Sequence, residues 1–496
     1  MSAGMARLTG HPRDHVSSVV VAALSATFGV VLLEATGLIA TVVDSSGMTE
    51  GSGTVRAILS VVTTVFTLIA VYVGAIVTAN TFSTIIAGRV REIALLRLIG
   101  AQAKLVRRSV ATEGLIVGLI GAGIGLVLGV LVAVVTVAVG IAQGWLPALE
   151  YAFLDPAILL PAGVVAITTW AAAWIGSRTV TTVTPLAATG ASVEATREES
   201  IRRPVRNVLA ILLFVLGIGL VLLGVAVGLV SVFGLLIAFA GGVLSFTGII
   251  VGAHLIMPPV LTLVGRMLGA RPPARLAAAN AVRFPDRSSR ATIGLVIGVT
   301  LVIMFAVAMQ SYSDMIVSQF ADDPMALAAI DQTLTVTTAI FTGLVGFSAV
   351  IAAVGMVNNL SLSVLQRTRE LGLLRALGFT GRQVRSMILA ESTQMTVAAV
   401  GLGLVLGVFY GWAAAQSMLG SVVHAVVAPS LPWGIIGITV AAGIVLTLVA
   451  SVAPARRGAT ISPGVALGGA ERRHSAAAPP GGGAGAAQPP PPPPPP

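Results

Sequence analysis

Long apolar runs alternate with short charged stretches along most of the chain. Ten runs are long enough to cross a bilayer, whose apolar core of about 30 Å needs about 20 apolar residues per helix. They cover residues 16–43, 57–87, 110–142, 156–177, 207–229, 232–257, 291–313, 334–364, 387–419 and 432–454. The pattern predicts an all-α polytopic membrane protein with about ten transmembrane helices.

Composition excludes the soluble alternatives. Of the 496 residues, 56% are hydrophobic and 10% are charged, too few charges to cover a globular surface of this size. The net charge of +10 would fit a nucleic-acid binder if the basic residues formed one face. They lie instead in short blocks between the apolar runs, so we expect a lipid bilayer and no nucleic acid as the chain's surroundings.

The distribution of charge also predicts the orientation. If the N-terminus is cytoplasmic, inner segments hold 28 of the 29 basic residues and only Arg56 lies outside. The predicted outer loops are short and acidic, with Asp155 and Asp314 as examples. Both termini are therefore expected in the cytoplasm. An excess of arginine over lysine, 28 to 1, is consistent with a GC-rich bacterial genome and so with the bacterial cytoplasmic membrane.

An internal repeat organises the chain. Shifting the sequence by 278 residues aligns RVREIALLRLIG at 89–100 with RTRELGLLRALG at 367–378 without a gap. The same shift aligns Asn80 with Asn358, Glu113 with Glu391 and, at the far end, Pro185 with Pro463. The period is six spans, an even number, so the two copies are parallel in the membrane.

The predicted arrangement is four spans, two linking spans and four spans. Its segments are 1–56 with the first span, 57–190 as the first repeated domain, 191–290 as a linker with two spans, 291–334 with the seventh span, 335–468 as the second repeated domain, and an Ala/Gly/Pro-rich tail at 469–496. The tail ends in eight prolines and is predicted to be disordered or polyproline II. A solvated tail is favoured over a ligand for a proline-binding module.

The repeated cytoplasmic segment carries the main functional signal. We call it the elbow: an amphipathic helix that extends the preceding span, ends at a glycine and leads through a basic stretch into the next span. The elbow is charged and also carries leucines, so neither lipid nor water favours its exposure. A projecting segment of this composition is suited to bind in a groove on a soluble partner. Arginines anchoring helix ends at the headgroups would explain the charge alone. Retention of the whole pattern Arg-Glu-x-x-Leu-Leu-Arg-x-x-Gly in both copies favours docking. The residues are Arg91, Glu92, Leu95, Leu96, Arg97 and Gly100, and Arg369, Glu370, Leu373, Leu374, Arg375 and Gly378.

With its glycine-rich following span and closing basic-to-proline stretch, this segment resembles the FtsX/MacB-type ABC transporter permease domain. Both copies match, over about 57–190 and 335–468, and a ten-span chain with two such domains is similar to the bacitracin-exporter type. The resemblance implies that each elbow is a coupling helix that docks on a nucleotide-binding subunit, and that transport is outward. Relatives carry large extracytoplasmic domains after the first or seventh span. None fits here, which puts peptide sensing, lipoprotein handling and wall-hydrolase control in doubt.

Catalytic and metal sites are not expected in this chain. A phosphate-binding loop needs G-x-x-x-x-G-K-[ST], and the one lysine, Lys104, follows Ala103. The chain is therefore not expected to be an enzyme, and ATP and Mg²⁺ would be bound by the partner. The histidines form no metal-spaced set, and there is no cysteine.

Two kinds of residue stand out inside the spans. Glycines recur every fourth residue in the third and ninth spans, at Gly121, Gly125 and Gly129 and at Gly403, Gly407 and Gly411. This spacing lets helices approach closely, either between the two halves or within one half. Glu113 and Glu391 lie near the inner interface and are expected to form structural salt bridges with Arg97 and Arg375. Glu34 either marks a substrate path or extends its carboxylate to the outer interface.

These patterns predict the permease subunit of an ABC transporter, coupled to two copies of a cytoplasmic ATPase and moving a hydrophobic or amphipathic substrate. Two rivals remain. A secondary transporter would need an ionisable site in the packed interior, where Glu34 is the one candidate acid. A non-transporting signal relay would need an outer docking surface, and the short outer loops disfavour it.

Overall fold

The computed structural model describes residues 12–45, 102–177, 203–267, 285–321 and 377–445, together with parts of 61–79, 278–283 and 334–350. Every regular element in these residues is helical. The elements are α2 (Pro12–Ser45), α5 (Ala103–Gln143), η1 (Pro156–Ile158), α6 (Leu159–Gly176), α9 (Pro204–Gly228), α10 (Gly234–Val251), α11 (Ala253–Met267), α13 (Pro285–Gln319) and α16 (Gly381–Val423).

The all-α polytopic prediction is confirmed. Seven helices in the described part of the chain are long and apolar enough to cross a membrane. They correspond to the first, third to seventh and ninth predicted spans. The remaining predicted spans fall on partly described residues, including the shorter apolar helix Trp433–Val445, so the total of ten stays a prediction.

The sixth span differs from its predicted form. Helix α10 ends at Val251, the chain bends at Gly252, and α11 continues to Met267 with Pro258 and Pro259 inside it. Proline has no backbone N–H to donate and glycine weakens a helix, so a bend here is physically reasonable. Hydropathy alone cannot show it, because apolar residues continue across the bend.

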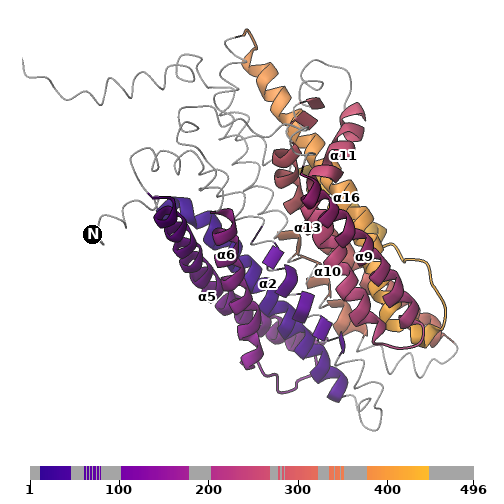
Figure 1. Ribbon diagram of the computed structural model, residues 1–496. Coiled ribbons are helices and arrows are strands. Elements are labelled where there is room, and N and C mark those ends of the chain that lie inside the picture. Colours follow the sequence, from indigo (N-terminus) through magenta and orange to yellow (C-terminus); the bar gives the residue numbers. More distant parts are fainter. Residues whose placement is uncertain are drawn as a thin grey trace, which may run out of the picture.

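The helices form two groups around a shared centre (Figure 1). Helices α2, α5 and α6 contact one another, and α13 and α16 pack together with α9, α10 and α11 beside them. The central helices are α2 and α13, which are mostly buried, whereas α5 and α9 expose most of their surface. Phe28 of α2 meets Phe305 of α13 with ring centroids 6.4 Å apart, within one apolar core that joins the groups.

The linking helices α9 and α10 form a tight antiparallel hairpin. Glycines recur every seven residues on each helix, at Gly217 and Gly224 and at Gly234, Gly241 and Gly248. A Cβ atom on any of them would meet backbone atoms of the facing helix, such as Ser245 N for Gly217 and Ala238 N for Gly224. Glycine therefore lets these two backbones come into direct contact.

This linker hairpin packs along α16 of the second half. Both α9 and α10 contact α16, and a Cβ on Gly228 would meet the Cα of Ser417 at 2.6 Å. Helix α11 contacts α13 and α16 as well, where the buried Gln394 Nε2 donates a hydrogen bond to the Leu261 carbonyl at 2.7 Å. All three linker helices therefore contact α16 of the second half.

The segment after α16 is fixed to the helix by side-chain hydrogen bonds. Trp412 Nε1 donates to the Val427 carbonyl at 2.7 Å, and the Gln416 amide bonds Ala425 and the Val427 N–H at 2.8 and 3.0 Å. These bonds satisfy the polar groups of Trp412 and Gln416 in an apolar setting, as burial requires. The loop is therefore held against the end of α16.

Candidate functional site

Most of the elbow lies outside the described residues. This applies to Arg91, Glu92, Leu95, Leu96, Arg97 and Gly100 in the first copy, and to Arg369, Glu370, Leu373, Leu374 and Arg375 in the second. Gly378, the last residue of the second elbow, is described. The structure therefore describes two parts of the site. These are the joints, where each elbow meets its following span at about residues 102 and 378–380, and the helices that continue from them.

The second joint is a glycine turn followed by a capped helix. Gly378 has φ of 97°, a conformation that L side chains rarely adopt, which explains why glycine ends this elbow. Thr380 then caps α16: its Oγ1 accepts from the Gln383 N–H at 3.3 Å, and Gln383 Oε1 accepts from the Thr380 N–H at 2.9 Å. This reciprocal pair is a capping box, which fixes the first turn of the helix.

The first joint lacks this cap. Gln102 occupies the position equivalent to Thr380, and its side chain makes no capping hydrogen bond. Two copies of one motif thus begin their following helices differently. The first turn of α16 should therefore be stiffer than the first turn of α5.

Thr380→Ala should loosen the start of α16. Loss of an N-cap costs about 1 kcal/mol, so amide exchange in the first turn should rise roughly fivefold, as hydrogen exchange with mass spectrometry of the purified protein would measure. Thr112→Ala is the control, because Thr112 bonds the Arg108 carbonyl within α5 and caps no helix. Equal exchange at α16 in both variants would contradict the proposed difference between the joints.

The helices after the joints are long and continuous. Helix α5 has 41 residues and α16 has 43, which correspond to about 62 and 65 Å, roughly twice the thickness of a bilayer core. Both begin with basic residues, Lys104 and Arg107 in α5 and Arg382 and Arg385 in α16, and we call this end of the bundle the basic side. Each helix runs without a break from the joint to the opposite side, as a rigid lever would.

Charged residues near the basic side have different surroundings in the two halves. The guanidinium of Arg107 lies 4.1 Å from the centre of the Trp174 ring, a cation–π contact between α5 and α6. Glu113 is partly buried and Glu391 is buried. Their expected partners, Arg97 and Arg375, lie outside the described residues, so those salt bridges stay predictions.

The repeated glycines face the neighbouring helix of their own half. A Cβ on Gly121, Gly125 or Gly129 would meet α2, and a Cβ on Gly403, Gly407 or Gly411 would meet α13. Of the two arrangements that the spacing allows, the structure places these contacts within each half.

The two sets of glycine contacts have the same register. Gly125 lies against the backbone N of Thr27 and Gly129 against its carbonyl, while Gly403 and Gly407 make the same two contacts with Thr300. Helices α2 and α13 are therefore structural equivalents, although the sequence match that defines the repeat begins after them. The duplicated unit includes the first and seventh spans.

Helix α10 is hydrogen-bonded to both repeated halves. The Tyr72 hydroxyl, from the segment 61–79, donates to the Val243 carbonyl at 3.1 Å and lies 2.9 Å from Thr247 Oγ1. From the other side, the Tyr410 hydroxyl of α16 lies 2.8 Å from Ser245 Oγ. Neighbouring positions of one linker helix thus hold one span of each half.

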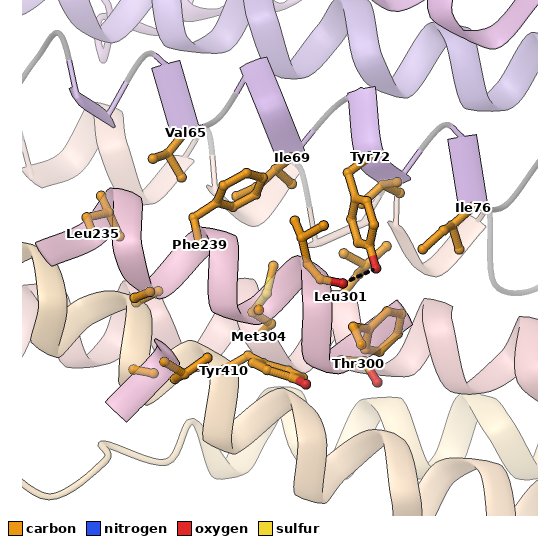
Figure 2. A pocket seen from close by; sticks show the side chains of 18 of the residues that line it. Val65, Ile69, Tyr72, Ile76, Leu235, Phe239, Thr300, Leu301, Met304 and Tyr410 are labelled. Atoms are coloured by element: carbon orange, nitrogen blue, oxygen red, sulfur yellow. Dashed lines mark hydrogen bonds between the residues drawn. The ribbon is translucent and has the colours of Figure 1, made fainter. Parts of the chain in front are cut away.

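A cavity of about 110 Å³ lies between these helices (Figure 2). The segment 61–79 and α10 form one side, with Ile69 and Phe239 among the lining residues, and α13 and α16 form the other. The lining is almost entirely apolar. The cavity therefore lies where the first half, the linker and the second half meet.

Glu34 is the remaining candidate, and it is buried. It lies in α2 with 5% of its surface exposed, and among the described residues its Oε1 has no hydrogen-bond partner. The side chain therefore does not extend to solvent, which was one of the two expectations for it. A carboxyl group in this position is costly unless it is protonated or paired.

Comparison with known proteins explains the duplicated architecture. The C-terminal domain of FtsX-like permeases matches residues 64–185 and again residues 342–463, and similar segments occur in proteins named ABC transporter permease and MacB. The chain is a permease of the FtsX/MacB type. The two matched ranges are equally long, and the distance between their first residues equals the period of the repeat. Each half of this permease therefore carries one FtsX-like domain.

Similar proteins share part of this permease. The uncharacterized ABC transporter permease YknZ of Bacillus subtilis is 30% identical over 141 residues, 28% of this chain and 34% of that protein. The macrolide export ATP-binding/permease protein MacB of Bdellovibrio bacteriovorus is 34% identical over 115 residues, 22% of this chain and 17% of that protein. An uncharacterized ABC transporter permease of Methanocaldococcus jannaschii is 25% identical over 134 residues, 27% of this chain and 33% of that protein. The chain thus matches about a third or less of each of these relatives.

Sequence reasoning missed the residues that hold the permease's halves to α10. Three of the four tyrosines in the chain, Tyr72, Tyr312 and Tyr410, lie inside the predicted apolar runs, where a buried hydroxyl needs a partner. Two of them, Tyr72 and Tyr410, bond α10. The seven-residue spacing of glycine in α9 and α10 was a second available signal. Both patterns would have indicated that the linking spans pack tightly and join the halves.

Proposed function

We propose that this permease is the transmembrane subunit of an ABC transporter at the bacterial cytoplasmic membrane, with both termini in the cytoplasm. Its two elbows dock on two copies of a separate ATPase, which binds ATP and Mg²⁺. Hydrolysis there drives export or extraction of a hydrophobic or amphipathic substrate. The observation that carries this proposal is the paired match to the FtsX-like domain, with one complete elbow motif in each copy.

The continuous helices support a mechanical role. At the second elbow a displacement would reach α16 through one short turn, because Gly378 and the Thr380 cap lie directly before the helix. Helices α5 and α16 pack along α2 and α13 through glycine contacts, so movement of the levers is passed to the two central helices. Closure of two ATPase subunits would in this way rock one half against the other.

Co-purification tests the proposal. The tagged permease is extracted in mild detergent from its native host, and the proteins that accompany it are identified and counted. We expect two ATPase subunits, with a nucleotide-binding P-loop, for each permease chain. Recovery of the permease alone, under conditions in which other transporter complexes stay intact, would contradict the proposed partnership.

The burial of Glu34 favours a secondary transporter as the second candidate. An ionisable group in the packed interior is what coupling to a proton gradient requires, and Glu34 is 5% exposed. The two candidates differ in their energy source. Transport that stops with a protonophore while ATP is intact, and that is also lost in Glu34→Gln, would favour the secondary transporter; transport that continues in both cases would favour ATP coupling.

A further inference from the structure

The cavity between the halves is enclosed by apolar helices. Its lining comes from five helical segments, including Leu301 of α13 and Ala413 of α16. Toward the start of α10 it is closed by a cluster in which Val61, Val62 and Val65 pack with Leu235. The surroundings of the cavity are therefore apolar, as a molecule that enters from the bilayer would require.

The lining is suited to a hydrocarbon chain. No charged residue is among the described residues that line the cavity, so an ionised head group would be costly inside it. The hydroxyls of Tyr72 and Tyr410 are already hydrogen-bonded to α10. An apolar cavity of about 150 Å³ stays dry and accepts a molecule the size of benzene. The cavity here, at about 110 Å³, is smaller and suits the end of a hydrocarbon chain.

One polar group in the lining has no partner. Thr300 is 3% exposed, and among the described residues its Oγ1 makes no hydrogen bond. A trapped water needs two to four polar partners, and this site supplies one unused hydroxyl. A cavity with this lining is therefore expected to stay dry and to remain open to a hydrocarbon chain.

The repeat itself indicates that this site is specialised. At the equivalent positions of the other copy, Tyr72 is replaced by Val350 and Tyr410 by Val132. Helix α10, to which both tyrosines are hydrogen-bonded, belongs to the linker and lies outside the repeat. The two copies therefore differ at the positions of Tyr72 and Tyr410, which line the cavity, although the glycine contacts of the two copies are the same.

We propose that this cavity binds the end of a hydrocarbon chain of a membrane amphiphile, whose head group remains outside. The proposed function decides only the role of the ligand, which would be a transported substrate in a transporter and a resident lipid otherwise. Binding itself requires neither ATP nor the ATPase. An occupied cavity would fill the space beside the Tyr72 and Tyr410 hydrogen bonds, and so would stabilise the attachment of both halves to α10.

Photolabelling of the purified permease tests the proposal. The protein is placed in nanodiscs of phosphatidylcholine and phosphatidylglycerol with a trace of probe, either phosphatidylglycerol or palmitic acid carrying a diazirine near the chain end. Labelled residues are then identified by mass spectrometry. We expect saturable labelling of residues such as Ile69, Phe239 and Met304, and labelling of the exposed Val127 that rises linearly with probe, as for boundary lipid. Labelling by both probes would identify the chain alone as the ligand, and labelling by palmitic acid alone would identify a single-chain amphiphile.

The chain offers a matched pair of variants. Gly242 lines the cavity, and a Cβ there would meet nothing within 4 Å, so Gly242→Leu fills the cavity without displacing the backbone. Gly219, on the partner helix of the same hairpin, also has open space and does not line the cavity, so Gly219→Leu is the control. We expect roughly tenfold lower cavity labelling in Gly242→Leu and no change in Gly219→Leu.

Two results would overturn the assignment: cavity labelling that is linear with probe in the unaltered protein, or labelling that is the same in both variants. The first comparison needs no variant, so it stands even if Gly242→Leu folds poorly. Failure of the transporter proposal is seen separately, as absence of the ATPase from the purified complex. A permease that retains its ATPase but shows no saturable label would refute the cavity assignment alone.

Discussion

Changing Leu95 and Leu373 together to aspartate should abolish binding of the ATPase subunit and leave the permease in the membrane. If the elbows dock through their leucines, each substitution places a charge in an apolar contact. Burying an unpaired charge costs several kcal/mol, enough to weaken each contact by at least about a hundredfold. Insertion should be unaffected, because the apolar spans determine it and the elbows lie outside them.

Quantitative co-purification of the ATPase with the tagged permease measures this effect. The single variants should each retain about one ATPase per permease, and the double variant should retain none, if each elbow holds one copy. Val205→Asp is the control: Val205 is 81% exposed on the same basic side, in the first turn of α9, where a carboxylate is favourable to the helix dipole. A double variant that still binds two ATPase subunits would refute the assignment of the elbows.

Replacing Gly125 and Gly403 together by leucine should destabilise the permease strongly. A Cβ at Gly125 would lie 2.5 Å from the Ala23 carbonyl oxygen, and a Cβ at Gly403 would lie 2.7 Å from Val299 Cγ1. The helices would have to separate in both halves. Overpacking of this kind costs about 1–3 kcal/mol at each site, and the two sites are in different halves, so the effects should add to about 2–6 kcal/mol.

The repeat supplies the control for this experiment. Gly123 and Gly401 are equivalent positions on the same two helices; both are exposed, and a Cβ on either would meet nothing within 4 Å. Leucine at both should change stability by no more than about 0.5 kcal/mol. Thermal unfolding in detergent should show a lower midpoint, by at least about 5 °C, for the Gly125/Gly403 pair only. Equal midpoints for the two pairs would contradict the α2–α5 and α13–α16 contacts.

The sequence by itself determined the class of the protein, most of its spans and its duplication. A bilayer requires long apolar helices whatever their neighbours are, so the run of residues that forms α5 or α13 is visible before any packing is known. The 278-residue repeat can likewise be found from the sequence alone. The repeated motif was the basis for the resemblance to the FtsX/MacB-type permease domain, which the paired domain match supports. The elbows were also identified from sequence, and their docking role stays a prediction.

The tertiary structure decided which surfaces meet. The spacing of Gly121, Gly125 and Gly129 allows close approach to any helix, and only the fold shows that the partner is α2. The same holds for α9 to α11, which pack on the second half and place α10 between Tyr72 and Tyr410. Lipid solvates every apolar face equally well, so hydropathy cannot distinguish a lipid-facing residue from a helix-facing one. Shape and hydrogen bonding between residues distant in sequence make that choice, and they formed the cavity that the sequence did not predict.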